Sequence, residues 1–150
     1  MSHYFTDNRE LVKNRREITF RFFNYDYIIE TDNGVFSKDH VDTGTQSLLK
    51  ACLKQDLNNS KICDLGCGYG IIGLVLSKEF ENVEVTGFDV NPLAVELANI
   101  NFAKNSVKGE NILNDGIIGT YDWVITNPPI RVGKEKMYSL FDEAYESLHK

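Results

Sequence analysis

A glycine-rich segment near the middle of the chain constrains the fold more than any other part of the sequence. The segment Asp64-Leu-Gly-Cys-Gly-Tyr-Gly70 follows a short apolar stretch, 61–64, and precedes a helical apolar pattern over 71–80. Glycines allow positive φ and let a ligand approach the backbone closely. The first turn of the following helix offers free N–H groups to an anion. A strand, a tight turn and a helix in this order are typical of an open parallel sheet, where ligands bind beyond the carboxyl ends of the strands.

Strand and helix patterns alternate through the rest of the chain. Residues 83–88 predict a second strand, and Asn91-Pro92 predicts the start of a helix with Asn91 as its N-cap. We expect a weak third strand near 110–113, a clear fourth strand over 121–126 and an amphipathic helix over 137–148. This alternation predicts an α/β fold, a parallel sheet with helices on its faces.

The N-terminal part has a different pattern. Residues 17–31 are rich in β-branched and aromatic side chains, which predicts two short strands joined by a tight turn near Asn24. Helical spacing over 45–54 predicts a helix with Thr43 or Thr45 as its N-cap. The N-terminal hairpin would be an appendage to the parallel sheet.

Length and composition fit a globular chain. The protein has 150 residues, of which 42% are hydrophobic and 25% charged. We expect an N-terminal β-rich extension over residues 1–36 and a core domain over residues 37–150. No apolar run approaches the ~20 residues that span a bilayer, and the N-terminus lacks the apolar region of a signal peptide. A cytoplasmic protein with no membrane association is therefore expected.

The charge distribution leaves room for a nucleic-acid partner. The net charge of −6 argues mildly against one, because nucleic-acid binders are usually basic. However, residues 1–21 hold five basic and three acidic groups, so this segment is one place where RNA could bind. A solvated polar segment is the alternative. Cys63 and Cys67 have no second Cys or His pair beside them, so no metal site is expected.

Two acidic residues flank the glycine turn in sequence. Asp64 precedes it, and Asp89 follows the second predicted strand, where a carboxylate can accept both hydroxyls of a ribose. The segment 68–73 also matches the G-x-G-x-x-G pattern of dinucleotide-binding proteins, which makes an NAD(P) oxidoreductase an alternative. Asp64 argues against that alternative, because a carboxylate directly after the strand would repel a pyrophosphate but would suit a cationic amine.

A second unusual segment, Asn127-Pro128-Pro129-Ile130, follows the fourth predicted strand. Two consecutive prolines fix a stiff, extended backbone. This stiffness would hold the Asn127 amide oxygen and the Pro128 carbonyl in fixed directions. A planar exocyclic amino group could donate its two N–H bonds to these acceptors, with its nitrogen lone pair directed at a methyl donor. Such catalysis works by positioning and electrostatic stabilisation.

These two segments resemble known motifs. Asp64 to Gly70 is similar to the first motif of class I S-adenosylmethionine-dependent methyltransferases. Asn127 to Ile130 resembles the N/D-P-P-Y/F/W motif of methyltransferases that act on amino groups of nucleic acids or of glutamine. The resemblance implies a Rossmann-like sheet and S-adenosylmethionine as cofactor. The cofactor-binding residues that it implies are Asp64, Gly66, Gly68, Gly70, Asp89, Val90, Asn91, Asp115 and Asn127.

Further segments resemble the ribosomal RNA guanine-N2 methyltransferases of the small subunit. They are Gly34 to Ser37 with Asp42 to Thr45, and Asn127 to Lys134. This resemblance implies that Phe36 and Thr45 help to hold the cofactor, and that Arg131 and Lys134 could meet an RNA phosphate. Ile130 replaces the aromatic residue that stacks on a target base, which disfavours a flipped adenine. Guanine N2 of small-subunit ribosomal RNA is the expected target, and a protein glutamine stays open.

The length of the chain bears on whether it is expected to be active alone. The resemblance implies a sheet of seven strands, whereas this chain supplies four, so we expect a partial sheet that lacks the last strands. An RNA-binding module without turnover, or one that a partner chain completes, is therefore a second hypothesis. The sequence leaves the oligomeric state open.

Overall fold

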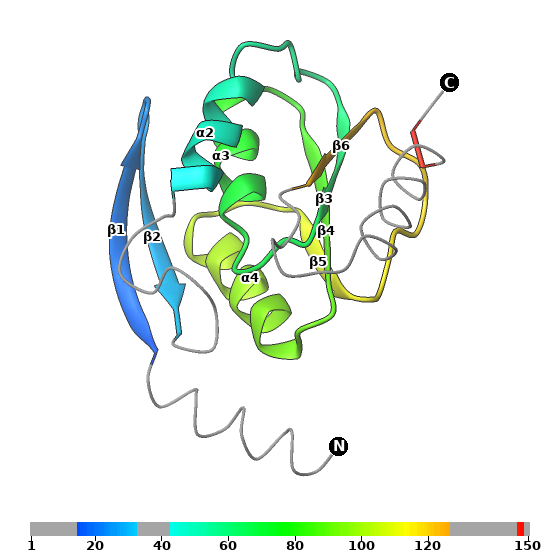
Figure 1. The fold of residues 1–150 in the computed structure, drawn as a ribbon. Helices are drawn as coiled ribbons and strands as arrows, with labels where there is room; N and C mark the ends of the chain where they lie inside the picture. The colour runs from blue at the N-terminus through cyan, green and yellow to red at the C-terminus, as the bar shows by residue number, and fades with distance from the viewer. Residues whose placement is uncertain (1–14, 33–42, 127–146, 149–150) are drawn as a thin grey trace.

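The computed structural model describes residues 15–32, 43–126 and 147–148. In these ranges the chain forms two sheets, and the helices lie between them (Figure 1). No helix in the described ranges has both the length and the apolar character needed to cross a membrane.

The larger sheet is parallel throughout. It consists of β3 (Lys61–Leu65), β4 (Glu84–Asp89), β5 (Glu110–Leu113) and β6 (Trp123–Thr126), in the order β5-β4-β3-β6. The chain therefore proceeds from β3 outward to β5 and then crosses to the other side of β3. Strand order reverses at β3, which is where ligands bind in folds of this class. The predicted parallel α/β sheet is confirmed.

Three helices follow the predicted pattern closely. They are α2 (Thr43–Cys52), α3 (Ile71–Glu79) and α4 (Pro92–Lys104). The prediction of Asn91 as the N-cap of α4 is confirmed, because its side-chain oxygen accepts the amides of Leu93 and Ala94. The prediction of Thr43 or Thr45 as the N-cap of α2 is wrong. Helix α2 begins at Thr43, so both threonines lie inside its first turn.

Side chains of β3 alternate between two apolar clusters. Ile62 belongs to the main cluster, with residues of α3, α4 and the hairpin, whereas Cys63 and Leu65 belong to a smaller cluster that also contains Phe88 and Tyr121. All three β3 residues are buried, as expected for a central strand whose two faces are both covered. The sheet therefore holds the residue between them, Asp64, rigidly.

The N-terminal strands form the predicted hairpin. β1 (Arg16–Phe22) and β2 (Tyr25–Thr31) pair antiparallel around a two-residue turn, Phe23-Asn24. In Figure 1 this hairpin lies on the far side of the helices from the parallel sheet, against α4. The predicted division between residues 36 and 37 falls outside the described residues and stays a prediction.

The C-terminal end of the described chain departs from the predicted helix over 137–148. Leu148 forms an isolated parallel bridge with Tyr121, and the Tyr121 amide donates to the Ser147 carbonyl at 2.7 Å. The prediction is wrong for Leu148, because its backbone pairs laterally instead of within a helix. The predicted fourth strand also begins later than expected, at Trp123. Residues 137–146 lie outside the described residues.

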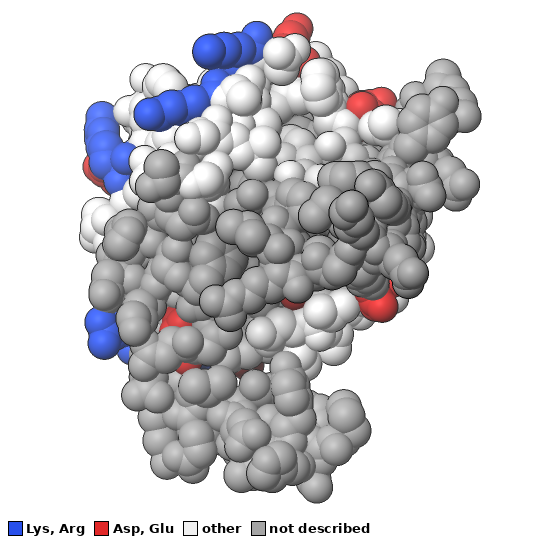
Figure 2. All heavy atoms as spheres, viewed as in Figure 1, with Lys and Arg blue, Asp and Glu red and all other residues white. Residues whose placement is uncertain are grey.

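Two basic residues at the hairpin, Arg15 and Arg21, have acidic partners. Arg15 pairs with Glu96 and, at 3.5 Å, with Glu30, and Arg21 pairs with Asp26 at 3.2 Å. In the view of Figure 2, most of the visible Lys and Arg side chains gather along the side that the hairpin and α2 form. The ion pairs of Arg15 and Arg21 neutralise part of the positive charge that was expected to attract RNA. RNA binding by residues 1–21 stays a prediction.

Candidate active site

The candidate site lies at the carboxyl ends of β3 and β4. The glycine-rich segment leaves β3 and crosses the end of β4, where the amides of Gly66 and Cys67 both donate to the Phe88 carbonyl, at 2.8 and 3.0 Å. The loop then turns into α3, and the Gly70 amide donates to the Cys67 carbonyl at 3.0 Å. These bonds bring the loop and the end of β4 together, as predicted from their sequence positions.

Asp89 braces this loop with both oxygens of its carboxylate. Oδ2 accepts the Gly68 amide at 2.9 Å, and Oδ1 accepts the Asn91 amide at 3.0 Å. A carboxylate has about four acceptor sites, so each oxygen retains capacity for a further donor. Asp89 can therefore hold the loop and accept hydroxyl groups of a ligand at the same time.

Asp64 is a buried carboxyl group without a complete set of partners. Its residue is 2% exposed, and its Oδ1 atom has no hydrogen-bond partner within the described part of the protein. Burial, together with the negative charge of Asp89, raises the pKa of Asp64 to about 7. Burying a charge is costly unless it is paired, so this site favours a cationic hydrogen-bond donor beside Asp64.

Gly66 and Gly70 serve different purposes in the loop. Both have positive φ, +76° and +94°. A Cβ placed on Gly66 would meet no atom of the described residues within 4 Å, so the space beside it is open to a ligand. A Cβ on Gly70 would lie 3.1 Å from Ala98, so this position is fixed by packing of the loop on α4. The loop therefore has an open side at Gly66 and a packed side at Gly70.

The remaining predicted residues are placed as follows. Val90 is 61% exposed beside Asp89, and the side chain of Asn91 caps α4. Asp115 is exposed and follows Asn114, whose amide donates to the Asp89 carbonyl at 3.0 Å. Thr45 is buried on α2, a helix that packs against α3. The structure thus brings the segment at Asp115 to Asp89, and the roles of these residues toward a ligand stay predictions.

Several predicted site residues cannot be placed. The residues outside the described ranges are Phe36, Asn127, Pro128, Pro129, Ile130, Arg131 and Lys134. β6 ends at Thr126, at the same edge of the sheet as the ends of β3 and β4. The segment that begins at Asn127 therefore starts from the edge that carries the glycine loop.

Asn101 also contacts the glycine loop, although it was not among the residues predicted for the site. Its side-chain Nδ2 donates to the Tyr69 carbonyl, inside the glycine loop, at 2.8 Å. A signal was present in the sequence, because asparagine is a poor residue for a helix interior and Asn101 lies in the last turn of α4. Within the described ranges, no group of three or more His, Cys, Asp or Glu residues is placed to hold a metal ion.

Parallel strand order, a glycine loop after the central strand and an acid at the end of the next strand define the class I methyltransferase type of Rossmann-like fold. The fold is similar to that of a T. thermophilus 16S rRNA N2 G1207 methyltransferase, solved with AdoMet and guanosine. The TM-score is 0.80 at 24% identity, over 90% of this chain and 39% of that chain. A M. jannaschii tRNA m1G37 methyltransferase also has this fold, with a TM-score of 0.67 at 20% identity.

The chain belongs to the methyltransferase small domain family, whose model matches residues 26–150. The Bacillus subtilis protein YbxB is 34% identical over 97% of this chain and 75% of its own length. Ribosomal RNA small subunit methyltransferase C of Actinobacillus pleuropneumoniae is 35% identical over 73% of this chain. Ribosomal RNA large subunit methyltransferase G of Psychromonas ingrahamii is 31% identical over 91% of it.

These relatives confirm the predicted family, that of S-adenosylmethionine-dependent methyltransferases. They favour this interpretation of the glycine loop over the dinucleotide-binding one. The chain spans 34% of the length of the small-subunit enzyme and 39% of the large-subunit enzyme.

Proposed function

We propose that this protein binds S-adenosylmethionine at the glycine loop and transfers its methyl group to an exocyclic amino group of ribosomal RNA. The observation that carries the proposal is Asp64, a buried carboxyl group whose Oδ1 has no partner among the described residues, beside a loop with open space at Gly66. The ammonium group of the cofactor is a donor of the kind that this site lacks.

The other residues of the site fit the remaining groups of the cofactor. Asp89 keeps acceptor capacity for the two ribose hydroxyls, and its position is fixed by the Gly68 and Asn91 amides. The segment at Asp115 would lie near the adenine, because Asn114 is bonded to the Asp89 backbone. When bound, S-adenosylmethionine supplies an electrophilic methyl group. The protein contributes binding, orientation and exclusion of water.

Asn127 and Pro128 would hold the amino group that accepts the methyl group. Their oxygens would accept its two N–H bonds and favour the pyramidal nitrogen, whose lone pair can attack. Pro129 would stiffen the segment and Ile130 would pack against the target base, while Arg131 and Lys134 would contact RNA phosphates. A strong general base is unnecessary, because the nitrogen becomes acidic once the new N–C bond has formed.

Guanine N2 of small-subunit ribosomal RNA is the target that we propose. Two relatives support an RNA target, the small-subunit methyltransferase C at 35% identity and the large-subunit methyltransferase G at 31%. The T. thermophilus neighbour, which acts on guanine N2 of 16S rRNA, favours this amino group. Ribosomal RNA as substrate also implies a cytoplasmic site of action.

Methyl transfer from labelled S-adenosylmethionine tests this proposal directly. The substrates are 30S subunits, 50S subunits, naked 16S RNA and a glutamine-containing protein fraction. We expect label in guanine N2 of the small-subunit RNA. The Asn127→Ala variant should lose transfer, whereas Asn127→Asp keeps an acceptor oxygen and should retain part of it. Label only in 50S subunits would change the target, and binding of RNA and cofactor without transfer would favour a non-catalytic module.

A further inference from the structure

Asn101 of α4 and Asn105, the C-cap residue of that helix, bind the edge of β2 that does not pair with β1. β1 occupies one edge of β2, and the other edge faces α4. Asn105 accepts the Ile28 amide at 3.1 Å and donates to the Ile28 carbonyl at 2.9 Å. Asn101 makes the same pair of bonds with Glu30, at 2.7 and 3.0 Å. The two side-chain amides therefore stand in for a neighbouring strand and satisfy an edge that would otherwise be open to other chains.

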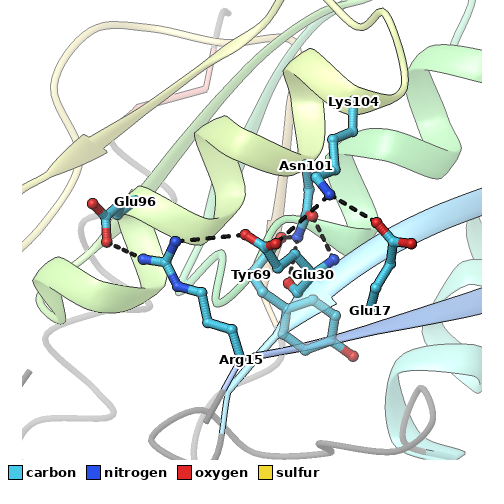
Figure 3. A network of polar contacts seen from close by, with 7 residues as sticks. All are labelled: Arg15, Glu17, Glu30, Tyr69, Glu96, Asn101 and Lys104. Atoms are coloured by element: carbon cyan, nitrogen blue, oxygen red, sulfur yellow. Dashed lines mark hydrogen bonds and ion pairs between the residues drawn. The ribbon is translucent and has the colours of Figure 1, made fainter. Parts of the chain in front are cut away.

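Asn101 makes one more bond, which leads away from the hairpin. Its second N–H donates to the Tyr69 carbonyl at 2.8 Å, so one amide group joins β2, α4 and the glycine loop (Figure 3). Asn105 donates its second N–H to the Asn101 carbonyl, in the last turn of α4, at 2.8 Å. The two residues therefore make the same type of contact with the hairpin, and only Asn101 is bonded to the glycine loop.

The buried hydrogen bonds of Asn101 contribute more to the contact between the hairpin and α4 than the exposed ion pairs do. Asn101 is fully buried, and all its side-chain donors and its acceptor are used. Lys104 also pairs with Glu17 at 2.8 Å and with Glu30 at 3.6 Å, but these ion pairs are partly exposed and screened by solvent. A buried amide that loses its partners is costly, so the hairpin and the loop are held together through Asn101.

We propose that Asn101 is a positioning residue that couples docking of the N-terminal hairpin to the shape of the cofactor loop. The coupling rests on the proposed function, in that the loop binds S-adenosylmethionine. Gly68 and Gly70, on either side of Tyr69, both have positive φ and can adopt other conformations. Asp89 fixes the loop at the Gly68 amide, and Asn101 fixes it at the Tyr69 carbonyl. If the hairpin moved away from α4, Asn101 would lose its bonds to Glu30 and would no longer hold the Tyr69 carbonyl in place.

A matched pair of variants tests this coupling in the full chain. Asn101→Asp replaces the donating NH₂ by oxygen beside the carbonyls of Glu30 and Tyr69, and Asn105→Asp does the same beside those of Ile28 and Asn101. Both should lower the melting temperature. We expect only Asn101→Asp to weaken S-adenosylmethionine binding by calorimetry, by about tenfold, which is what the loss of one buried hydrogen bond amounts to. Equal affinities for the two variants would overturn the proposal.

Hydrogen exchange of the ligand-free protein separates this proposal from the proposed function. Asn101→Asp should accelerate exchange over residues 66–74, and Asn105→Asp, which leaves the three Asn101 side-chain bonds in place, should do so much less. Unchanged exchange there would overturn the coupling even if the wild type binds the cofactor, whereas a wild type that binds none would contradict the proposed function alone. If both variants fail to fold, the wild type suffices: because coupling is reciprocal, saturating S-adenosylmethionine should slow exchange of the Ile28 and Glu30 amides. No slowing would contradict the coupling.

Discussion

The Asp89 carboxylate accepts the Gly68 amide at 2.9 Å and so ties the end of β4 to the loop that follows β3. Its other oxygen accepts the Asn91 amide at the start of α4. One side chain thus fixes the loop, the strand end and the next helix relative to one another. Asp64 lies in the adjacent strand, and among the described residues its Oδ1 has no hydrogen-bond partner, so the two acids of the site differ in what they stabilise.

This difference predicts that two conservative substitutions, Asp89→Asn and Asp64→Asn, affect the stability of the fold differently. Asp89→Asn places an N–H group against the amide of Gly68 or Asn91, so it should destabilise the fold by about 1–3 kcal/mol and also weaken cofactor binding. Asp64→Asn should weaken cofactor binding without destabilising the fold. Urea denaturation and calorimetric titration of both variants measure the two effects. Equal loss of stability in both variants would contradict the roles assigned here.

The glycine loop predicts a second contrast. Gly66→Ala adds a methyl group to open space, so it should cost only the strain of positive φ, about 1–2 kcal/mol, and should weaken cofactor binding by occupying that space. Gly70→Ala adds the same strain and places the methyl group 3.1 Å from Ala98, so it should lose more stability. Thermal unfolding gives the order of stability. A Gly66→Ala protein with wild-type cofactor affinity would show that the open space is not used.

The pKa of Asp64 predicts how stability depends on pH. Burial raises this pKa from 3.8 to about 7, so the folded protein keeps a proton that the unfolded chain releases between these values. The contribution of Asp64 to stability therefore falls as the pH rises from about 4 to about 7. Asp64→Asn removes this dependence, so the variant should be more stable than the wild type at pH 8 and similar to it near pH 4. Parallel stability profiles for the two proteins would contradict the raised pKa.

The same titration predicts the pH dependence of cofactor affinity. An ammonium donor binds the ionised form of Asp64 better than the protonated form, so binding must release a proton below pH 7. S-adenosylmethionine should therefore bind more tightly at pH 7.5 than at pH 5.5, and binding at pH 6 should release protons into the buffer. Calorimetry in two buffers of different ionisation enthalpy measures this release. Binding with no proton release at pH 6 would contradict an Asp64 contact with the cofactor.

The parallel sheet was predictable because its signals are local. Glycines after a strand, an asparagine before a proline and an acid at a strand end each reflect a backbone requirement of a few residues. These signals correctly placed Asp64, Gly66 and Asp89 at one edge of the sheet. The strand boundaries were shifted by one or two residues, because pairing with a neighbour decides where a strand ends.

The bond between Asn101 and Tyr69 was not predictable, because it depends on tertiary contacts. The hairpin contact with α4 joins residues about 70 positions apart, such as Glu30 and Asn101, and no short pattern encodes that distance. Leu148 fits a helical apolar spacing, yet its backbone bridges to Tyr121. Apolar periodicity indicates which side chains are buried. It does not determine whether the backbone of such a residue bonds within a helix or pairs with a neighbouring strand.

Calorimetric titration of S-adenosylmethionine into the wild type and into Asp64→Asn tests the central claim most directly. We predict one binding site per chain for the wild type at pH 7.5. The affinity should fall about 10- to 100-fold in Asp64→Asn, as expected for loss of a hydrogen bond to a charged group. Glu84→Gln changes an exposed acid at the opposite end of β4, so it serves as the control and should leave the affinity unchanged. No binding by the folded wild type at millimolar cofactor would contradict the claim.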